Sequence, residues 1–116
     1  MKTATPLLLS GALFMAFAAW APDAAAVDAK QAEALMKSHK CGSCHHPTRT
    51  KTGPSLGKIA EKYRGEADGE EKIITMMTTG PMVENEDGEE EEHKIIKTKS
   101  EAELKNLAQW ILSHGE

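Results

Sequence analysis

The feature that most constrains this chain is the segment Cys41–His45, of sequence CGSCH, which holds both cysteines of the protein. Two thiols three positions apart can add to the two vinyl groups on one side of a haem, and the adjacent histidine is then held beneath the iron as a ligand. A thioredoxin-like dithiol would follow a strand, and the sequence shows no convincing strand pattern. A structural zinc site would need a second ligand pair, and His39 and His46 lie too close to the first pair to supply it easily. The segment therefore favours covalent haem attachment over a zinc site or a simple dithiol.

The rest of the chain has few large side chains with which to build a core. Aromatic residues make up 4% of the 116 residues, and only Tyr63 and Trp110 lie beyond position 26. Small domains are marginally stable on hydrophobic burial alone and often recruit a metal, a disulfide or another filler. Two cysteines do not make a disulfide scaffold, and a disordered chain would not carry 40% hydrophobic residues. A haem would supply the missing apolar centre, so we expect the apoprotein to be largely unfolded.

Residues 1–26 have the three parts of a secretory signal peptide. Lys2 gives a cationic start, Leu7–Trp20 is almost entirely apolar, and the segment ends in Ala24–Ala26. The apolar run is too short to span a bilayer comfortably, which favours cleavage after Ala26 over an uncleaved anchor. We therefore expect a mature chain of residues 27–116 that folds as one domain and is exported to the periplasm, without stable membrane insertion.

Apolar residues at helical spacing predict four short helices in the mature chain, and hence an all-α fold. Asp28 is a candidate N-cap for the first helix, and Gly80-Pro81 ends the third because proline cannot continue the hydrogen-bond ladder. Ser100 and Glu103 have the spacing of a capping box, which starts the last and clearest helix. The predicted segments are residues 28–39, a stretch from near Ser55 to Tyr63, a stretch around Ile73–Met77, and residues from Ser100 to Leu112.

Charge is unevenly distributed along the mature chain. Acidic residues exceed basic ones by 18 to 14 in the whole sequence, which disfavours a nucleic-acid binder with a strongly basic surface. Seven of the nine residues in Glu84–Glu92 are acidic, and like charges at this density predict a solvated loop rather than a packed element. Outside that loop, residues 27–116 hold 13 basic and 10 acidic side chains. Oriented charge of this kind steers encounters, so we expect a monomer that docks transiently to redox partners.

These segments together resemble a class I c-type cytochrome of the small bacterial monohaem kind. The matching pieces are the CGSCH segment after a first helix, Thr52–Leu56 (TGPSL) before a second, and a closing helix over Leu104–Leu112. The resemblance implies about four short helices wrapped around one covalently bound haem c, with the first and last helices crossing near the haem edge.

The resemblance also assigns the residues that bind the cofactor. Cys41 and Cys44 would carry the two thioether bonds, and His45 would be the proximal ligand of the haem iron. The backbone carbonyl of Pro54 would accept a hydrogen bond from the other ring nitrogen of His45. Such a bond fixes the tautomer of a ligating histidine and raises its basicity.

The sequence departs from this family on the distal side of the haem. Relatives usually present a methionine on the loop a few residues before the last helix, whereas Lys94–Lys99 contain none. His93 stands at about that place and is the favoured distal ligand. Met82 is the alternative distal ligand, although it follows the third helix so closely that little chain remains to reach over the haem. Met76 and Met77 lie on the predicted third helix, where methionines more often fill the core than bind a metal. An iron that is open or binds water is the third alternative.

The expected function is that of a soluble carrier of single electrons between redox partners, and not that of an enzyme. With both axial positions filled, the iron changes valence without binding a substrate. If the distal ligand is loose or absent, the iron would instead bind small gases or peroxide. A subunit of a larger oxidoreductase is a further alternative. A second imidazole and the acidic segment would both stabilise ferric iron, so we expect a lower potential than that of methionine-ligated relatives.

Overall fold

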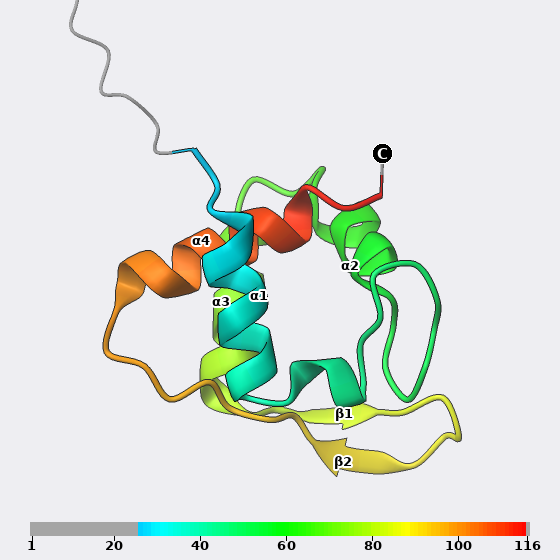
Figure 1. The fold of residues 1–116 in the computed structure, drawn as a ribbon. Coiled ribbons are helices and arrows are strands. Elements are labelled where there is room, and N and C mark those ends of the chain that lie inside the picture. Colours follow the sequence, from blue (N-terminus) through cyan, green and yellow to red (C-terminus); the bar gives the residue numbers. More distant parts are fainter. Residues whose placement is uncertain (1–25, 116) are drawn as a thin grey trace, which may run out of the picture.

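The computed structural model describes residues 26–115, which form four helices, one 3₁₀ turn and a β-hairpin, arranged as Figure 1 shows. Residues from all of these elements line a cavity. The four helices confirm the predicted fold class. The predicted signal peptide, residues 1–26, lies outside the described residues except for Ala26. Among the described residues, no helix has both the length and the apolar character needed to cross a membrane. The elements are α1 (Ala29–Ser38), the 3₁₀ turn η1 (Cys41–Ser43), α2 (Leu56–Tyr63), α3 (Gly69–Thr79), β1 (Met82–Glu84), β2 (Glu90–Glu92) and α4 (Glu101–Leu112).

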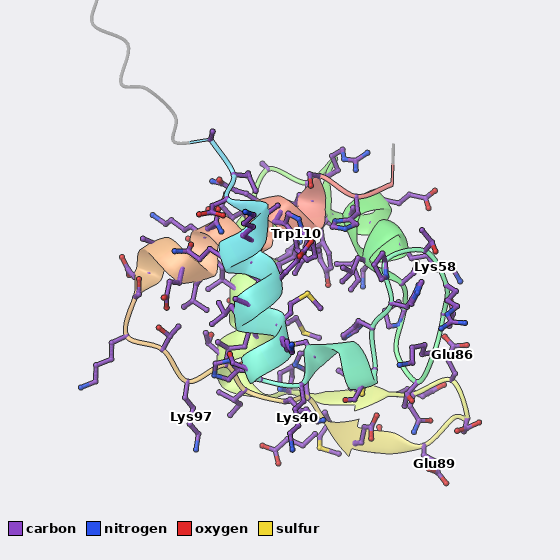
Figure 2. The ribbon with its side chains drawn as sticks, in the orientation of Figure 1. Lys40, Lys58, Glu86, Glu89, Lys97 and Trp110 are labelled. Carbon is purple, nitrogen blue, oxygen red and sulfur yellow. The ribbon has the colours of Figure 1, made fainter. Side chains whose placement is uncertain are left out.

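The acidic segment Glu84–Glu92, predicted to be an irregular loop, forms most of a β-hairpin. Strands β1 and β2 pair antiparallel, with Val83 opposite Glu91. The side chain of Asn85 accepts two backbone hydrogen bonds within the turn, which orders the chain there. Strand pairing uses the backbone, so the side chains of β2 stay exposed and Glu89 extends away from the body (Figure 2). The prediction of a solvated segment is confirmed, and the prediction that it lacks regular structure is wrong.

The predicted caps at Asp28 and Ser100 and the predicted helix end at Gly80 are present in the structure, and Ser55 caps the helix predicted to start near it. The carboxylate of Asp28 accepts a hydrogen bond from Gln31 N at 3.0 Å. The hydroxyls of Ser55 and Ser100 accept from the backbone N–H three residues further on, at the starts of α2 and α4. Each bond satisfies one of the N–H groups that a helix start leaves unpaired. Helix α3 ends at Gly80, whose φ of 60° is the left-handed conformation that favours glycine.

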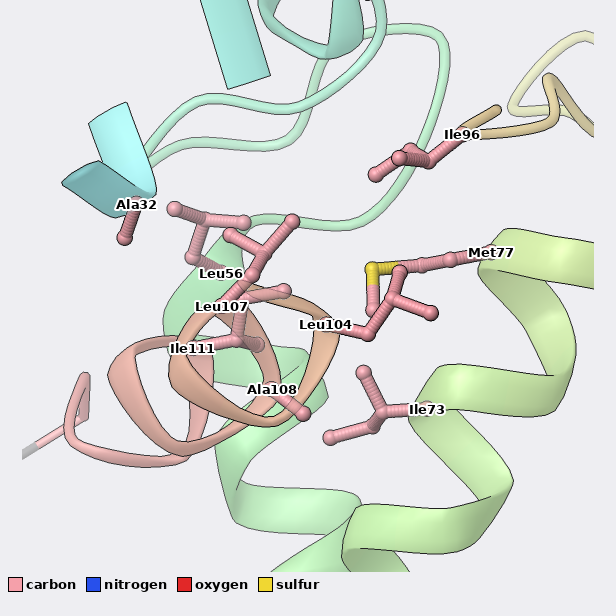
Figure 3. Packing of buried hydrophobic residues seen from close by; sticks show 9 residues of the cluster. All are labelled: Ala32, Leu56, Ile73, Met77, Ile96, Leu104, Leu107, Ala108 and Ile111. Atoms are coloured by element: carbon pink, nitrogen blue, oxygen red, sulfur yellow. The ribbon is translucent and has the colours of Figure 1, made fainter. Parts of the chain in front are cut away.

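The last helix, α4, is the centre of the hydrophobic core and packs against α1, α2 and α3. Leu107 and Ala108 are fully buried, and Leu104 points toward Met77 and Ile73 of α3 (Figure 3). Burial of one such aliphatic side chain contributes roughly 1.5–3 kcal/mol. Among the described residues, the buried members of the core include no aromatic side chain, although the partly buried Tyr63 and Trp110 pack against it. Several of these members also line the cavity. The buried members are Ala32, Leu56, Ile73, Met77, Ile96, Leu104, Leu107, Ala108 and Ile111.

The first and last helices are joined by a reciprocal pair of hydrogen bonds. Asp28 N donates to Asn106 Oδ1, and Asn106 Nδ2 donates to Asp28 O, both at 2.8 Å. The two residues are 78 positions apart, so this pair fixes the start of α1 on α4, which it crosses (Figure 1). Because α1 leads directly into η1, the same contact helps to place the two cysteines.

Candidate haem site

A cavity of about 370 Å³ opens between the helices and the hairpin. The helices supply a largely apolar wall, and the hairpin adds the acidic lining residues Glu84, Glu91 and Glu92. Apolar cavities of this size with a few convergent polar groups are the usual form of a cofactor site. The sequence-predicted residues Cys41, Cys44, His45 and Pro54 all lie on its wall, and so does His93 from the other end of the chain.

On the proximal side, His45 is held by a backbone carbonyl. Its Nδ1 lies 2.7 Å from Pro54 O, which is the contact that the family resemblance implies. With Nδ1–H donating to this carbonyl, Nε2 carries no hydrogen and is available to a metal. Burial lowers the pKa of His45 by more than the Pro54 hydrogen bond raises it. The ring is therefore neutral near pH 7, which is the form that binds iron.

The loop that leads to Pro54 lies closely against the His45 ring. Gly53 N donates to Cys44 O at 2.9 Å, which folds the loop back over the histidine. A Cβ atom on Gly53 would lie 2.8 Å from His45 Cε1, closer than nonbonded atoms tolerate. Any side chain at this position would therefore displace the ring.

The two cysteines flank the turn η1. Both are half-buried free thiols, and the backbone N–H groups of Cys44 and His45 donate to Cys41 O at 3.2 and 3.0 Å. This turn brings both sulfur atoms to the cavity wall beside His45. Burial is the main reason that the pKa of Cys41 is raised, so its thiol is protonated at neutral pH. A thiol that adds across a vinyl group donates both its sulfur and its hydrogen, and no group leaves.

On the distal side, His93 follows strand β2 and its ring lies opposite that of His45. The two ring centroids are 6.0 Å apart and the ring planes are tilted by 41°. The backbone N–H of His93 donates to Pro81 O at 2.9 Å, and its Nδ1 lies 2.9 Å from Lys94 O. With Nδ1–H donating to Lys94 O, the Nε2 of His93 is free, as it is in His45.

Met82, the alternative distal residue, does not line the cavity. It begins β1 and its side chain is 60% exposed, whereas the next residue, Val83, lines the cavity. Met76 and Met77 lie on α3 at the cavity wall, and Met77 is also part of the core.

Two lysines hold the outer surface of η1, and sequence reasoning missed both contacts. Lys51 Nζ donates to Gly42 O at 2.8 Å, and Lys94 Nζ donates to Ser43 Oγ at 2.9 Å. The partners are 9 and 51 positions apart, so no local spacing signals them.

The fold and the site together define a c-type cytochrome, because helices enclose an apolar cavity whose wall carries a CxxCH turn and a second histidine. The model of the Cytochrome c family matches residues 29–115, and the chain belongs to this family. Its members carry covalently attached haem c and are electron carriers. The cofactor of this protein is therefore haem c.

Individual relatives agree with this assignment. Cytochrome c-551 of Azotobacter vinelandii is 30% identical over 90 residues, which are 71% of this chain and 95% of that protein. Cytochrome c-552 of Hydrogenobacter thermophilus is 31% identical over 89 residues, or 70% of this chain and 79% of that protein. The crystal structure of class 1 cytochrome MtoD from Sideroxydans lithotrophicus ES-1 is 47% identical, with a TM-score of 0.75, over 78% of this chain and 100% of that chain. The class I fold expected from the sequence is thus confirmed.

The residues on the cavity wall fit haem c. Two thiols three positions apart suit two thioether bonds, and two imidazoles whose Nδ1 atoms lie against backbone carbonyls suit two axial positions through their Nε2 atoms. When bound, the haem supplies an iron that exchanges one electron. Cys41 and Cys44 would hold this group, His45 and His93 would face its iron, and the largely apolar wall would surround it.

Proposed function

We propose that residues 27–116 form a periplasmic carrier of single electrons, with haem c attached through Cys41 and Cys44. The axial ligands in this proposal are His45 and His93. The observation that carries it is the 6.0 Å separation of the two imidazole centroids. A metal–imidazole bond of about 2 Å, and about 1 Å from each ring nitrogen to its ring centre, give roughly 6 Å for two imidazoles on one metal. The separation therefore suits a single iron between the two rings.

Two side-chain ligands favour electron transfer over substrate chemistry. The Nδ1–H groups of His45 and His93 donate to Pro54 O and Lys94 O, which hold both rings in the ligating tautomer. Binding of small gases or peroxide, the rival function, requires His93 to leave the iron. This arrangement supports a carrier, and not an enzyme.

The experiment that tests this function is to record electronic and paramagnetic resonance spectra of the oxidised holoprotein, with His93→Ala and Met82→Ala beside it. We expect six-coordinate, low-spin iron without the weak near-infrared sulfur-to-iron band. Met82→Ala should leave the spectra unchanged, whereas His93→Ala should open the iron so that its ferrous form binds carbon monoxide at once. A sulfur-to-iron band that disappears in Met82→Ala but persists in His93→Ala would show that Met82, and not His93, is the distal ligand.

Export and partner docking have their own measurements. Cleavage after Ala26 predicts that the secreted holoprotein starts at Val27, which intact mass and N-terminal sequencing establish.

The acidic hairpin and the mildly basic body support steered encounters with partners, so electron exchange should slow as salt shortens the screening length to about 10 Å at 0.1 M. A rate of electron exchange that does not change with ionic strength would contradict electrostatic steering. Sedimentation should show a monomer.

A further inference from the structure

The segment that carries His93 has few attachments to the rest of the described chain. Its backbone is held at His93, which donates to Pro81 O at 2.9 Å, and at Ile96, which donates to Met77 O at 2.7 Å and is buried. Between these two points, Lys94 and Ile95 are exposed. Both backbone bonds reach residues 77–81, so neither ties the segment to the turn that holds the cysteines.

The side chain of Lys94 makes that connection. Its ammonium donates to Ser43 Oγ at 2.9 Å, across 51 positions of sequence. The same hydroxyl donates to Lys40 O at 2.8 Å, which leaves its lone pairs to accept from the ammonium. The charge of Lys94 also acts on Cys41, whose thiol pKa it lowers against the larger effect of burial. The ammonium thus lies beside the residues through which the haem is attached.

Lys94 acts on the distal histidine as well. Its backbone carbonyl is the acceptor for His93 Nδ1 at 2.9 Å. One residue therefore orients the distal ring with its backbone and reaches the attachment turn with its side chain. Displacing this residue would alter both the orientation of His93 and its distance from the haem.

We propose that Lys94 is a positioning residue for the distal ligand. Its hydrogen bond to Ser43 holds the His93 segment against the haem-attachment turn and slows the departure of His93 from the iron. This inference rests on the proposed function, because it needs His93 as the distal ligand.

The test is the rate at which saturating carbon monoxide binds to the ferrous holoprotein, since carbon monoxide must wait for the distal ligand to leave. Lys94→Gln and Ser43→Ala should each raise this rate about three- to tenfold, the effect of losing one surface hydrogen bond. The double variant should be no faster than the faster single variant, because both changes remove the same contact. Lys94→Arg, which keeps the charge and the donors, should restore most of the wild-type rate.

Two lysines provide matched controls. Lys51→Gln removes the same charge from the same turn, where Lys51 donates to Gly42 O and its hydrogen bond does not involve the His93 segment. Lys97→Gln removes a charge from the same segment, at a side chain that points away from the body (Figure 2). Both should keep the wild-type rate. The reduction potential should fall in Lys94→Gln and Lys51→Gln, which lose a positive charge, and stay unchanged in Ser43→Ala.

The outcomes separate this inference from the function on which it rests. If His93→Ala leaves the rate unchanged, His93 is not the ligand and both proposals are wrong. If His93→Ala makes binding immediate while Lys94→Gln and Ser43→Ala keep the wild-type rate, the proposed function stands and the role of Lys94 is overturned. Equal acceleration by Lys51→Gln would assign the effect to charge and would also overturn it.

Discussion

The proximal and distal sides of the haem cavity are built in different ways. On the proximal side, the cysteines, His45 and the Pro54 carbonyl all fall within residues 41–54. On the distal side, His93 depends on contacts with Pro81 and, through its neighbours, with residues as far away as Ser43. A local set of contacts forms whenever its own stretch of chain is ordered. A set drawn from distant segments forms only when the whole molecule is assembled.

This difference predicts that the two sides respond differently to substitutions. The proximal side should resist changes elsewhere in the molecule, because the proposed thioether bonds and a short loop would define it. The distal side should respond to changes in the hairpin, at the end of α3 and in η1. Exchange of the distal ligand is then the sensitive measurement, and the overall free energy of unfolding is the insensitive one.

The largest effect should follow from preventing haem attachment with Cys41→Ala and Cys44→Ala together. The buried core has no aromatic side chain and lines a cavity of about 370 Å³, which the apoprotein has nothing to fill. We expect loss of cooperative thermal unfolding and of most helical circular dichroism. A compact apoprotein that melts cooperatively would contradict this expectation and would show that neither side needs the cofactor to form.

The next largest effect should come from the proximal side, with Gly53→Ala. The added Cβ would lie 2.8 Å from His45 Cε1, so the variant should be destabilised by roughly 1–3 kcal/mol. Chemical denaturation measures this loss, and the spectrum of the oxidised haem reports the displaced ring. Gly42→Ala is the control, since its Cβ would meet nothing within 4 Å, and it should change stability by less than about 0.5 kcal/mol. Equal stability of the two variants would show that the loop at Gly53 moves to accommodate the added Cβ atom at little cost in free energy.

Gly80→Ala makes the corresponding change on the distal side. Gly80 has a φ of 60°, and a Cβ there would lie 2.9 Å from Ile95 Cγ1 and 3.1 Å from His93 O. We expect a loss of about 1–2 kcal/mol together with faster carbon monoxide binding to the ferrous protein. Gly88→Ala has the same kind of backbone strain at a φ of 79° with nothing within 4 Å, so it should keep the wild-type ligand-exchange rate. If Gly53→Ala accelerates exchange as much as Gly80→Ala does, the two sides are coupled and the comparison fails.

The same contrast explains how much of the structure could be predicted from sequence. The N-cap at Asp28, the capping box at Ser100 and the helix stop at Gly80 are local signals, and the structure has all three helix boundaries; the cap at Ser55 agrees with a helix start predicted near that residue. The proximal motif is equally local, and its placement on the cavity wall needs only a helix before it and a loop after it. His93 is a candidate on the sequence because it stands at about the place where the family usually presents a methionine, and its role as a ligand stays a prediction.

The missed features are non-local. The density of like charge in Glu84–Glu92 predicts a loop, whereas the backbone pairing of β1 with β2, which does not depend on those side chains, makes a hairpin. The turn residue Asn85 was visible in the sequence, but the strands on either side lack the alternation that marks a half-buried strand. The contact of Lys94 with Ser43 spans 51 positions and depends on where the hairpin returns the chain, which no local pattern encodes.

The smallest expected effect concerns charge on the distal side. Glu91 lies on the cavity wall, whereas Glu89 extends from the outer end of the hairpin (Figure 2). A negative charge near the iron favours the ferric state, so Glu91→Gln should raise the reduction potential by on the order of 20 mV. Glu89→Gln should raise it less, because a more distant exposed charge is screened more strongly by salt. Voltammetry at low and high ionic strength measures both shifts. Equal shifts that vanish together in salt would mean that the hairpin acts through its overall charge, and not through the placement of its side chains at the distal wall.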